Sequence, residues 1–281
     1  MIKFLTSLIW ILNHPDNRNK VLHTLFRIVW WKINQLMFKF PVVVELMKGI
    51  KYIAYPNSSF GGLVVYTRLP EYHEMNYFYN LIDSTDIVID VGVHMGDYSL
   101  LAASKITSGK VLSFEPSKEA LRVFRENILI NKYENRIEVY PVVASDKQGS
   151  VSFVDSNISE VSHISFSLKS TKNKNKVKSL PVDSIIQSQG ISKIKVVKID
   201  VEGAELLVLR GLEKSLTKHL IKNIIVEVNS DCINYGYAPT DTFEYLKKFG
   251  YKLYFFDKQG KLKNLMSFPL NKKYVNIIAK L

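Results

Sequence analysis

Short apolar runs, rich in β-branched residues and with little polar alternation, recur along the chain from residue 87 onward. Such runs are typical of strands buried on both faces, as in a parallel sheet covered by helices. Segments with apolar residues at helical spacing, such as 117–131, lie between several of them. The pattern predicts an α/β protein with a doubly wound, mostly parallel sheet of seven strands, the last two forming an antiparallel edge pair. The predicted strands are 87–89, 111–114, 136–142, 196–199, 222–228, 251–256 and 274–279.

The upstream part of the chain follows a different pattern. We expect residues 1–82 to form an appendage of helices and a hairpin ahead of a single domain at 83–281. Residues 41–54 contain two short apolar runs around a Lys-Gly turn, which indicates the hairpin. The glycine pair at 61–62 is interpreted as a flexible loop, because glycine lowers helix and strand stability.

A helix is predicted at 21–38, and its apolar stripe admits two interpretations. Basic residues and two tryptophans lie among the apolar positions, a composition found in helices that lie in a membrane interface. The favoured interpretation is that the helix packs on the following domain and buries its stripe there. The stripe consists of Leu22, Leu25, Phe26, Val29, Ile33, Leu36 and Met37.

The turn after the first sheet strand carries the most informative spacing. Asp90 ends the strand, Gly92 and Gly96 follow, and a helix with an apolar face begins near Tyr98. Glycines let the backbone turn sharply and let a ligand approach main-chain atoms, at the strand end where doubly wound sheets bind ligands. The middle glycine of the dinucleotide motif G-x-G-x-x-G is missing. The alternative is a tight strand-to-helix turn without a ligand.

Two further strands end in acidic residues. Glu115 follows the second strand, about 20 residues beyond the glycine turn, where a carboxylate is suited to accept both hydroxyl hydrogens of a ribose. Asp200 ends the fourth strand, and Glu202 and Glu205 come directly after it. The alternative for each glutamate is that it caps the helix that follows.

Four segments resemble the FkbM family of S-adenosylmethionine-dependent methyltransferases: VIDVGVHMGDYSLLAA, VLSFEP, VVASDKQGSVSF and VVKIDVEGAELLVLRG. They occur in order between about Asp86 and Asp257, and KIDVEGAE is the most specific of them. The resemblance implies a Rossmann-like methyltransferase fold, S-adenosylmethionine as the cofactor, and an upstream region that forms part of a lid. The chain departs from the family in its glycine turn, where Val93 and His94 replace the usual Ala and Asn.

The resemblance also assigns cofactor contacts to three strand ends. Asp90 would hold part of the cofactor, the glycines would pass beneath its amino-acid tail, and Glu115 would bind the ribose. Ala144 and Asp146 lie where this fold cups the adenine, although Asp146 could instead only begin the next turn. The residues predicted to bind the cofactor are Asp90, Gly92, His94, Gly96, Tyr98, Glu115, Ala144, Asp146 and Asp200.

Methyl transfer from a sulfonium is a direct displacement, so the enzyme must hold the acceptor in line with the methyl group. A hydroxyl acceptor must also lose its proton. Asp200 is predicted as the base or the acceptor-positioning group, with Glu202 and Glu205 as further catalytic candidates. A metal held by these acids is the less favoured alternative, because no histidine lies beside them.

The resemblance points to O-methylation of a hydroxyl on a sugar, a glycolipid or a secondary metabolite. The fourth strand lacks the Asn/Asp-Pro-Pro-aromatic turn of nucleobase and amide N-methyltransferases, which favours an oxygen acceptor. Two other classes stay open: an RNA methyltransferase, because the chain is basic, and a non-catalytic module on the same fold. Nucleic acid is the less expected partner, since the lysine run at 169–178 has no interleaved aromatic residues.

Composition limits the compartment in which we expect the protein and the partners that it could bind. The chain has 281 residues, 47% of them hydrophobic, a formal charge of +12 and one cysteine, Cys232. One cysteine excludes an intramolecular disulfide, and the apolar run at 4–12 is shorter than the ~20 residues of a spanning helix. No cleavage site follows that run, so we expect a cytoplasmic protein. The positive charge suggests an acidic partner, such as a phosphorylated or lipid-linked glycan or an anionic membrane surface contacted peripherally.

Overall fold

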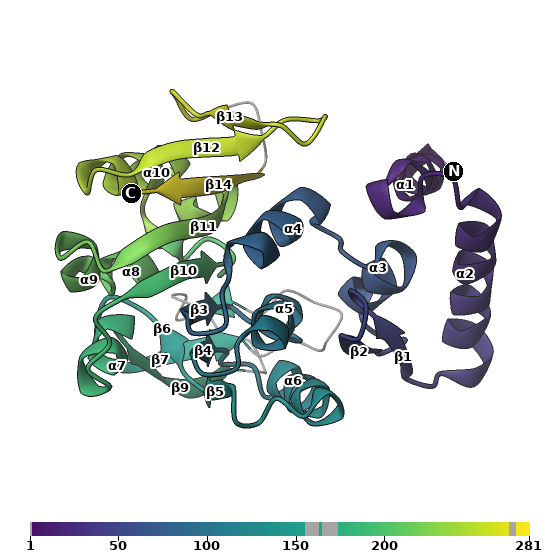
Figure 1. Cartoon of the computed structure of the whole chain (residues 1–281), viewed down its shortest axis with the longest axis horizontal. Helices are drawn as coiled ribbons and strands as arrows, with labels where there is room; N and C mark the ends of the chain where they lie inside the picture. Colours follow the sequence, from purple (N-terminus) through teal and green to yellow (C-terminus); the bar gives the residue numbers. More distant parts are fainter. Residues whose placement is uncertain (1, 155–162, 165–173, 270–273) are drawn as a thin grey trace.

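A computed structural model describes residues 2–154, 163–164, 174–269 and 274–281 of the chain (Figure 1). The molecule divides into an N-terminal part, a large central sheet with helices on both faces, and a smaller second sheet. The N-terminal part lies at one end of the molecule and the two sheets at the other (Figure 1).

The central sheet has eight strands. Their order is β13 (Leu262–Asn264), β12 (Lys252–Phe256), β14 (Tyr274–Lys280), β11 (Ile221–Asn229), β10 (Ile194–Ile199), β3 (Ile87–Val91), β4 (Lys110–Phe114) and β5 (Ile137–Tyr140). The strands from β11 to β5 are parallel, and β14 is antiparallel to both β11 and β12. The predicted doubly wound, mostly parallel sheet is therefore confirmed, and β13 adds a short eighth strand at its edge.

Successive residues of the central strands face two different apolar cores, which explains why the strands lack polar alternation. Val88 and Val111 belong to one core, and their neighbours Ile89 and Leu112 belong to the other. The first core is covered by α4 (Tyr72–Leu81), α5 (Asp97–Lys105) and α6 (Lys118–Asn131). The second is covered by α7 (Val182–Ser188), α8 (Glu205–Arg210), α9 (Glu213–Thr217) and α10 (Pro239–Lys248).

The second sheet contains part of the lysine run. Its order is β6 (Val143–Ala144), β9 (Lys174–Leu180), β7 (Gly149–Val154) and β8 (His163–Ile164). A run of lysines such as 169–178 is usually a solvated loop, but its residues 174–178 form part of β9, while Lys169 and Lys172 lie outside the described residues. Lys176 and Lys178 lie on either side of Val177, which packs near Phe153. The two-residue period of this segment therefore favours a strand in spite of its positive charge.

The N-terminal part consists of helices and one hairpin. Its elements are α1 (Ile2–Asn13), η1 (Pro15–Asn17), α2 (Val21–Ile33), η2 (Asn34–Phe38), β1 (Val42–Glu45), β2 (Lys51–Ala54) and α3 (Ser59–Thr67). The antiparallel pairing of β1 with β2 confirms the predicted hairpin. The predicted loop at 61–62 is wrong, because both glycines lie inside α3. A Cβ atom at Gly62 would lie 3.2 Å from Nε1 of Trp31, so glycine permits the close approach of α3 to α2.

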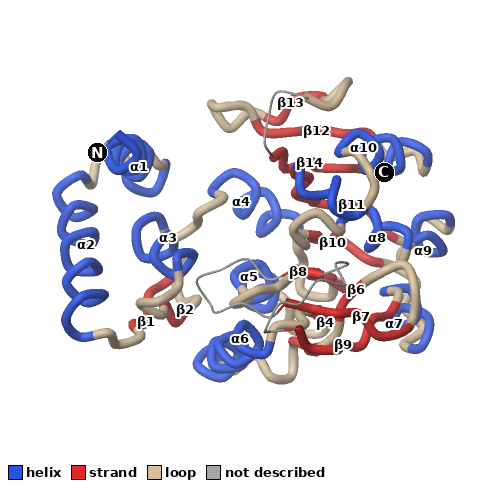
Figure 2. The backbone as a smooth tube through the Cα atoms, turned by 180° about the vertical axis from the view of Figure 1, so that it is seen from behind, coloured by secondary structure: helices blue, strands red, loops and turns tan. Residues whose placement is uncertain are grey.

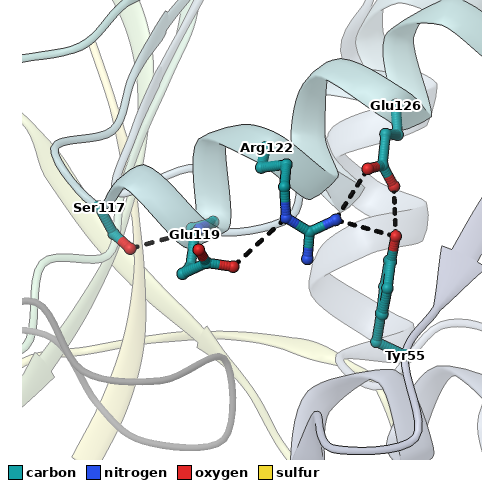
Figure 3. A network of polar contacts seen from close by, with 6 residues as sticks. Tyr55, Ser117, Glu119, Arg122 and Glu126 are labelled. Carbon is teal, nitrogen blue, oxygen red and sulfur yellow. Dashed lines mark hydrogen bonds and ion pairs between the residues drawn. The ribbon is translucent and has the colours of Figure 1, made fainter. Parts of the chain in front are cut away.

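Polar contacts join the hairpin to α6 of the main domain (Figure 3). The Tyr55 hydroxyl donates to Glu126 at 2.6 Å, and Arg122 donates to the Tyr55 hydroxyl at 3.0 Å and to Glu126 at 2.8 Å. Beside them, the backbone N–H of Ile53 donates to Asn127 at 2.7 Å. The N-terminal part is thus attached to the helix that follows β4.

The apolar stripe of α2 is exposed, contrary to the favoured expectation that the helix buries it. The side of α2 that carries Ile28 and Trp31 is buried. Leu22, Phe26 and Leu36 of the predicted stripe are instead 84%, 67% and 77% exposed. In both views α2 lies at the outer end of the molecule, with α3 and the hairpin between it and the sheets (Figures 1 and 2). The packing of Trp31 against α3 decides which side of α2 faces inward. Within the described part of the chain, no helix is long and apolar enough to cross a membrane.

Candidate active site

A cavity of about 520 Å³ lies at the carboxyl ends of the central parallel strands. The N-terminal part contributes Trp10, Phe60 and Leu63 to its lining. Among the described residues, seven carboxylate side chains and a single lysine, Lys198, also line it, so the cavity is acidic although the chain carries a net charge of +12. The carboxylates belong to Glu71, Asp90, Asp97, Glu115, Asp200, Glu202 and Glu227.

Most of the residues predicted from the sequence meet in this cavity. Gly96, Asp146 and Glu205 are the predicted residues that do not line it. Asp146 instead lies along a separate groove with Asp183, so its place in the fold does not support an adenine contact. The predicted residues that line the cavity are Asp90, Gly92, His94, Tyr98, Glu115, Ala144, Asp200 and Glu202.

The glycine turn between β3 and α5 is shaped by contacts within the protein. Gly92 has φ +81°, and a Cβ atom there would lie 1.7 Å from the carbonyl oxygen of Asp200. Gly96 has φ +99°, and a Cβ atom there would lie 2.2 Å from the ring of Phe124 on α6. Both positions therefore require glycine for close packing as well as for conformation.

Asp90 stands on a small polar network beneath the cavity. The hydroxyl of Ser99 lies 2.6 Å from the Asp90 carboxylate and 2.8 Å from the hydroxyl of Ser113. Burial raises the pKa of Asp90 to about 6, although the bond from Ser99 opposes the shift. The register of the two strands sets Asp90 of β3 opposite Lys198 of β10.

Glu115 is held in a fixed orientation at the end of β4. One of its carboxylate oxygens accepts the backbone N–H of His94 at 2.8 Å, and the other accepts that of Ser117 at 2.8 Å. The Glu115 side chain therefore both closes the glycine turn and supports the start of α6. A carboxylate offers about four lone-pair sites, so this orientation is compatible with a ribose diol.

The residues of the cavity fit S-adenosylmethionine. Pro116, Val143, Ala144 and Phe153 form an apolar part of the lining, which is suited to a purine ring. Glu115 lies at the neighbouring strand end, and the acidic lining, in which Glu71 is ionised, would complement the sulfonium and ammonium groups of the cofactor.

Lys198 is the buried cation at the centre of the acidic lining. Its Nζ lies 3.2 Å from a carboxylate oxygen of Asp200 and 3.8 Å from one of Glu71. The same Nζ lies 4.9 Å from the centre of the Tyr98 ring. Burial alone would lower the pKa of Lys198, but the charges of Asp200 and Glu71 outweigh it and raise that pKa. Lys198 is therefore charged and holds both carboxylates in place.

Glu71 connects the N-terminal part to this cluster. It lies just before α4 and accepts hydrogen bonds from the Tyr98 hydroxyl at 2.7 Å and from Asn276 of β14 at 2.8 Å. Burial alone would raise the pKa of Glu71, but Lys198 and these donors lower it. Glu71 is thus ionised in the folded protein.

Glu227 of β11 is a half-buried acid whose ionisation is opposed by its surroundings. Burial, followed by the negative charge of Asp200, raises the pKa of Glu227 to about 8. Glu71, Glu227 and Asn276 were not among the predicted site residues. The available signal was a polar residue inside an otherwise apolar strand, as in the IIVEV run of β11.

Glu202 and Glu205 occupy different places in the turn after β10. Glu202 lines the cavity with φ +50°, a left-handed conformation that is strained for a residue with a side chain, and Asn229 donates to it at 3.4 Å. Glu205 is buried outside the cavity and accepts the backbone N–H of Gly203 at 2.7 Å. Burial raises the pKa of Glu205 to about 8. Its position favours support of the turn and gives no contact with a reacting group.

Clustered acids are also the ligands of many metal sites. Across the described ranges, no group of three or more His, Cys, Asp and Glu side chains is placed to hold a metal ion.

Several curated methyltransferases are similar to this chain. It is 26% identical over 166 residues to the hexuronic acid methyltransferase AglP of Haloferax volcanii, covering 59% of this chain and 63% of that protein. It is 24% identical over 175 residues to the methyltransferase sdnD of Sordaria araneosa, covering 52% and 67%. The chain thus spans just under two thirds of the length of the Haloferax protein.

Several solved methyltransferase structures are also similar to this chain, at low TM-scores. The precorrin-6y C5,15-methyltransferase of Geobacter metallireducens has a TM-score of 0.42 and 11% identity, over 74% of this chain and 86% of that one. TrmK of M. capricolum in complex with S-adenosyl-homocysteine has a TM-score of 0.41 and 12% identity, over 74% and 67%.

The family model that matches the chain is the methyltransferase FkbM domain, over residues 90–253. The match begins at Asp90, includes the glycine turn, Glu115 and the cluster around Asp200, and ends in β12. Because it covers more than half of the sequence, the chain belongs to the FkbM family of S-adenosylmethionine-dependent methyltransferases.

Proposed function

We propose that this chain O-methylates a hydroxyl group on a sugar, a glycolipid or a secondary metabolite. The observation that carries the proposal is the cluster of Lys198, Asp200 and Glu227 at strand ends beside the glycine turn. The relative named as a hexuronic acid methyltransferase supports a sugar-type acceptor. When bound, S-adenosylmethionine supplies an electrophilic methyl group.

The two carboxylates of the cluster suit different tasks. Asp200 is paired with Lys198 at 3.2 Å, an arrangement that fixes its direction and makes it a suitable acceptor for a substrate hydroxyl hydrogen. Glu227 has a pKa of about 8, which is matched to proton removal near neutral pH. In this division of roles Asp200 orients the acceptor hydroxyl and Glu227 takes its proton. The sequence predicts Asp200 as the base or the acceptor-positioning group, and Asp200 as the base is the alternative to this division of roles.

The N-terminal part is proposed to act as the lid of the cavity. Trp10, Phe60 and Leu63 line the cavity together with Glu71. An apolar lid excludes water and strengthens the electrostatic interactions beneath it. In this proposal the lid comprises the elements up to α3, whereas α4, which also precedes the predicted division at residue 82, belongs with the sheet that it covers.

The two alternative functions meet specific difficulties. An RNA substrate would bring phosphates near an acidic cavity in which Glu71 is ionised, and like charges repel. A non-catalytic module would leave the buried charge of Lys198, with Asp200 and Glu227 near it, without a purpose, although buried charges are costly and cluster at functional sites.

The proposal is tested by incubating the protein with labelled S-adenosylmethionine and a fractionated host extract. Label is expected in a glycan, a glycolipid or a small metabolite, on a group that survives treatment that hydrolyses esters. Label in RNA would replace the proposal with RNA methylation, and no label in any fraction would favour the non-catalytic module.

A substitution then tests the cluster. Asp200→Asn should keep the melting temperature and the cofactor affinity but lower turnover strongly, because the acceptor loses its fixed partner. Glu244→Gln removes a carboxylate from the exposed surface of α10 and should leave turnover unchanged. Equal turnover in the two variants would show that Asp200 is structural.

A further inference from the structure

The outer side of α2 and η2 presents a continuous apolar surface, which we name the N-terminal apolar face. Its side chains are between 42% and 84% exposed. Soluble monomers rarely expose apolar patches of large contiguous area, and such patches usually mark a binding surface. The N-terminal apolar face consists of Leu22, Phe26, Val29, Trp30, Ile33, Leu36 and Met37.

The spacing of these residues shows that the exposure is organised. Leu22, Phe26, Val29, Ile33 and Leu36 follow one another at intervals of four and three residues, so they lie on one side of the helix. The opposite side of α2 is already buried. Both sides of α2 are thus partly apolar, but only one of them is covered by the rest of the protein. The other side is a second surface that a partner could cover.

The charges around this face identify the kind of surface that would cover it. Residues 1–44 contain six lysines and arginines and one acidic residue, Asp16. Lys20, Lys32 and Lys39 are exposed on the same helical segment or at its ends. The face also carries Trp30, and tryptophan is enriched where proteins meet the boundary between lipid headgroups and hydrocarbon.

We propose that the N-terminal apolar face binds an anionic lipid bilayer, with α2 lying in the plane of the interface. Anionic headgroups complement the exposed lysines while the apolar side chains enter the upper hydrocarbon. A second copy of the chain is the less suitable occupant, because two such faces would bring like charges together. The binding is peripheral, since α2 spans 13 residues, fewer than the ~20 of a membrane-spanning helix.

This surface is connected to the active site through α1. Trp10 of α1 lines the cavity, and α1 and α2 together form the outer end of the molecule (Figure 2). An acceptor attached to a lipid would then be encountered by diffusion within the membrane plane. Binding to the bilayer does not depend on the identity of the acceptor, so it can be tested separately from the proposed O-methylation.

The first experiment measures co-sedimentation of the full chain with vesicles of phosphatidylcholine, alone or mixed with phosphatidylglycerol. Binding is expected with the mixed vesicles, weaker binding with phosphatidylcholine alone, and a decrease as salt rises. No binding to the mixed vesicles would overturn the proposal.

Two pairs of substitutions locate the binding surface. Leu22→Gln with Phe26→Gln should lower the partition coefficient roughly tenfold or more, because two large apolar side chains no longer enter the bilayer. Lys32→Gln with Lys39→Gln should lower it by a similar factor on anionic vesicles only. The matched control, Leu129→Gln with Met266→Gln, removes two exposed apolar side chains elsewhere and should bind like the wild type. Equal loss in the control would show non-specific adsorption.

Two further readouts distinguish the bilayer from other occupants. Brominated lipids should quench part of the tryptophan fluorescence, and Trp30→Phe should reduce that quenching while binding persists. Light scattering without vesicles should show a monomer. A wild-type dimer that dissociates on Leu22→Gln with Phe26→Gln would overturn the proposal in favour of a second copy. Unchanged melting temperatures in all variants would show that each still folds.

Discussion

The active-site cavity and the N-terminal apolar face have opposite character within one chain. Seven carboxylates and one lysine line the cavity, whereas the first 44 residues carry six lysines and arginines and one aspartate. The net charge of +12 therefore comes from residues outside the cavity, and the cavity itself is acidic. A phosphate on the acceptor, suggested by the total charge alone, suits the cavity poorly. The positive charge is better placed to bind a surface.

The two regions also differ in how much change they should tolerate. In the cavity, neighbouring groups depend on one another within a few ångströms, as Gly92 does on the main chain of Asp200 and Lys198 on the Asp200 carboxylate. On the N-terminal apolar face each side chain is at least 42% exposed. Substitutions in the cavity should therefore have large effects that depend on one another. Substitutions on the N-terminal apolar face should have small effects that add.

The largest effect is expected from Glu227→Gln. Removing a general base typically lowers turnover by about 10²- to 10⁴-fold. Wild-type turnover should rise with pH toward the pKa of Glu227, about 8, because the carboxyl must lose its proton before it can accept another. That rise should vanish in the variant and is measured as the pH profile of turnover.

Asp200→Asn provides the matching test of the same pH profile. The negative charge of Asp200 contributes to the raised pKa of Glu227, so the residual activity of Asp200→Asn should rise at lower pH than that of the wild type. If the rise instead disappears in Asp200→Asn and persists in Glu227→Gln, Asp200 is the base.

A smaller but structural effect is expected from Gly92→Ala. The new Cβ would overlap the carbonyl oxygen of Asp200, and the alanine would have to keep a positive φ. The free energy of unfolding should therefore fall by about 3 kcal/mol or more. Gly190→Ala is the matched control, because Gly190 also has a positive φ but no atom within 4 Å of the new Cβ. Thermal unfolding should show a loss of about 1 kcal/mol for the control. Similar losses would mean that β3 and β10 can move apart.

Glu115→Ala should weaken binding of the cofactor product, S-adenosylhomocysteine, by about 1–3 kcal/mol, the usual loss when a charge-assisted hydrogen bond is removed. Part of that loss would arise because the backbone N–H groups of His94 and Ser117 lose their acceptor. Glu115→Gln keeps an acceptor oxygen, so its affinity for S-adenosylhomocysteine should lie between those of the wild type and Glu115→Ala. Calorimetry provides the measurement, and equal affinity in all three proteins would assign Glu115 to helix capping alone.

The smallest effect concerns salt and separates the two regions directly. Raising ionic strength should change cofactor affinity by less than about twofold, because the charges of the cavity are buried and poorly screened. Vesicle binding by the N-terminal apolar face should fall steadily over the same range. Parallel salt curves for both would show that the distinction between a buried acidic site and an exposed basic face is mistaken.

The sequence predicted the central sheet well, because its strands are buried on both faces and read as uninterrupted apolar runs. It also located Asp90, Glu115 and Asp200, since each ends such a run. It did not locate Glu71 or Asn276. Glu71 and Asn276 meet only because β14 inserts beside β11 and the start of α4 reaches across to it.

Local pattern alone determined the parallel strands of the central sheet, the glycine turn, the hairpin and the family. These features depend on residues that are close in sequence and whose conformational preferences are additive. Tertiary structure alone decided which of two apolar sides of α2 is covered, that Gly61 and Gly62 belong to a helix, and that Glu205 supports a turn while Glu227 enters the site. The physical reason is that burial is set by what packs against a residue, and for Trp31 and Gly62, or Lys198 and Glu71, the partner lies far away along the chain.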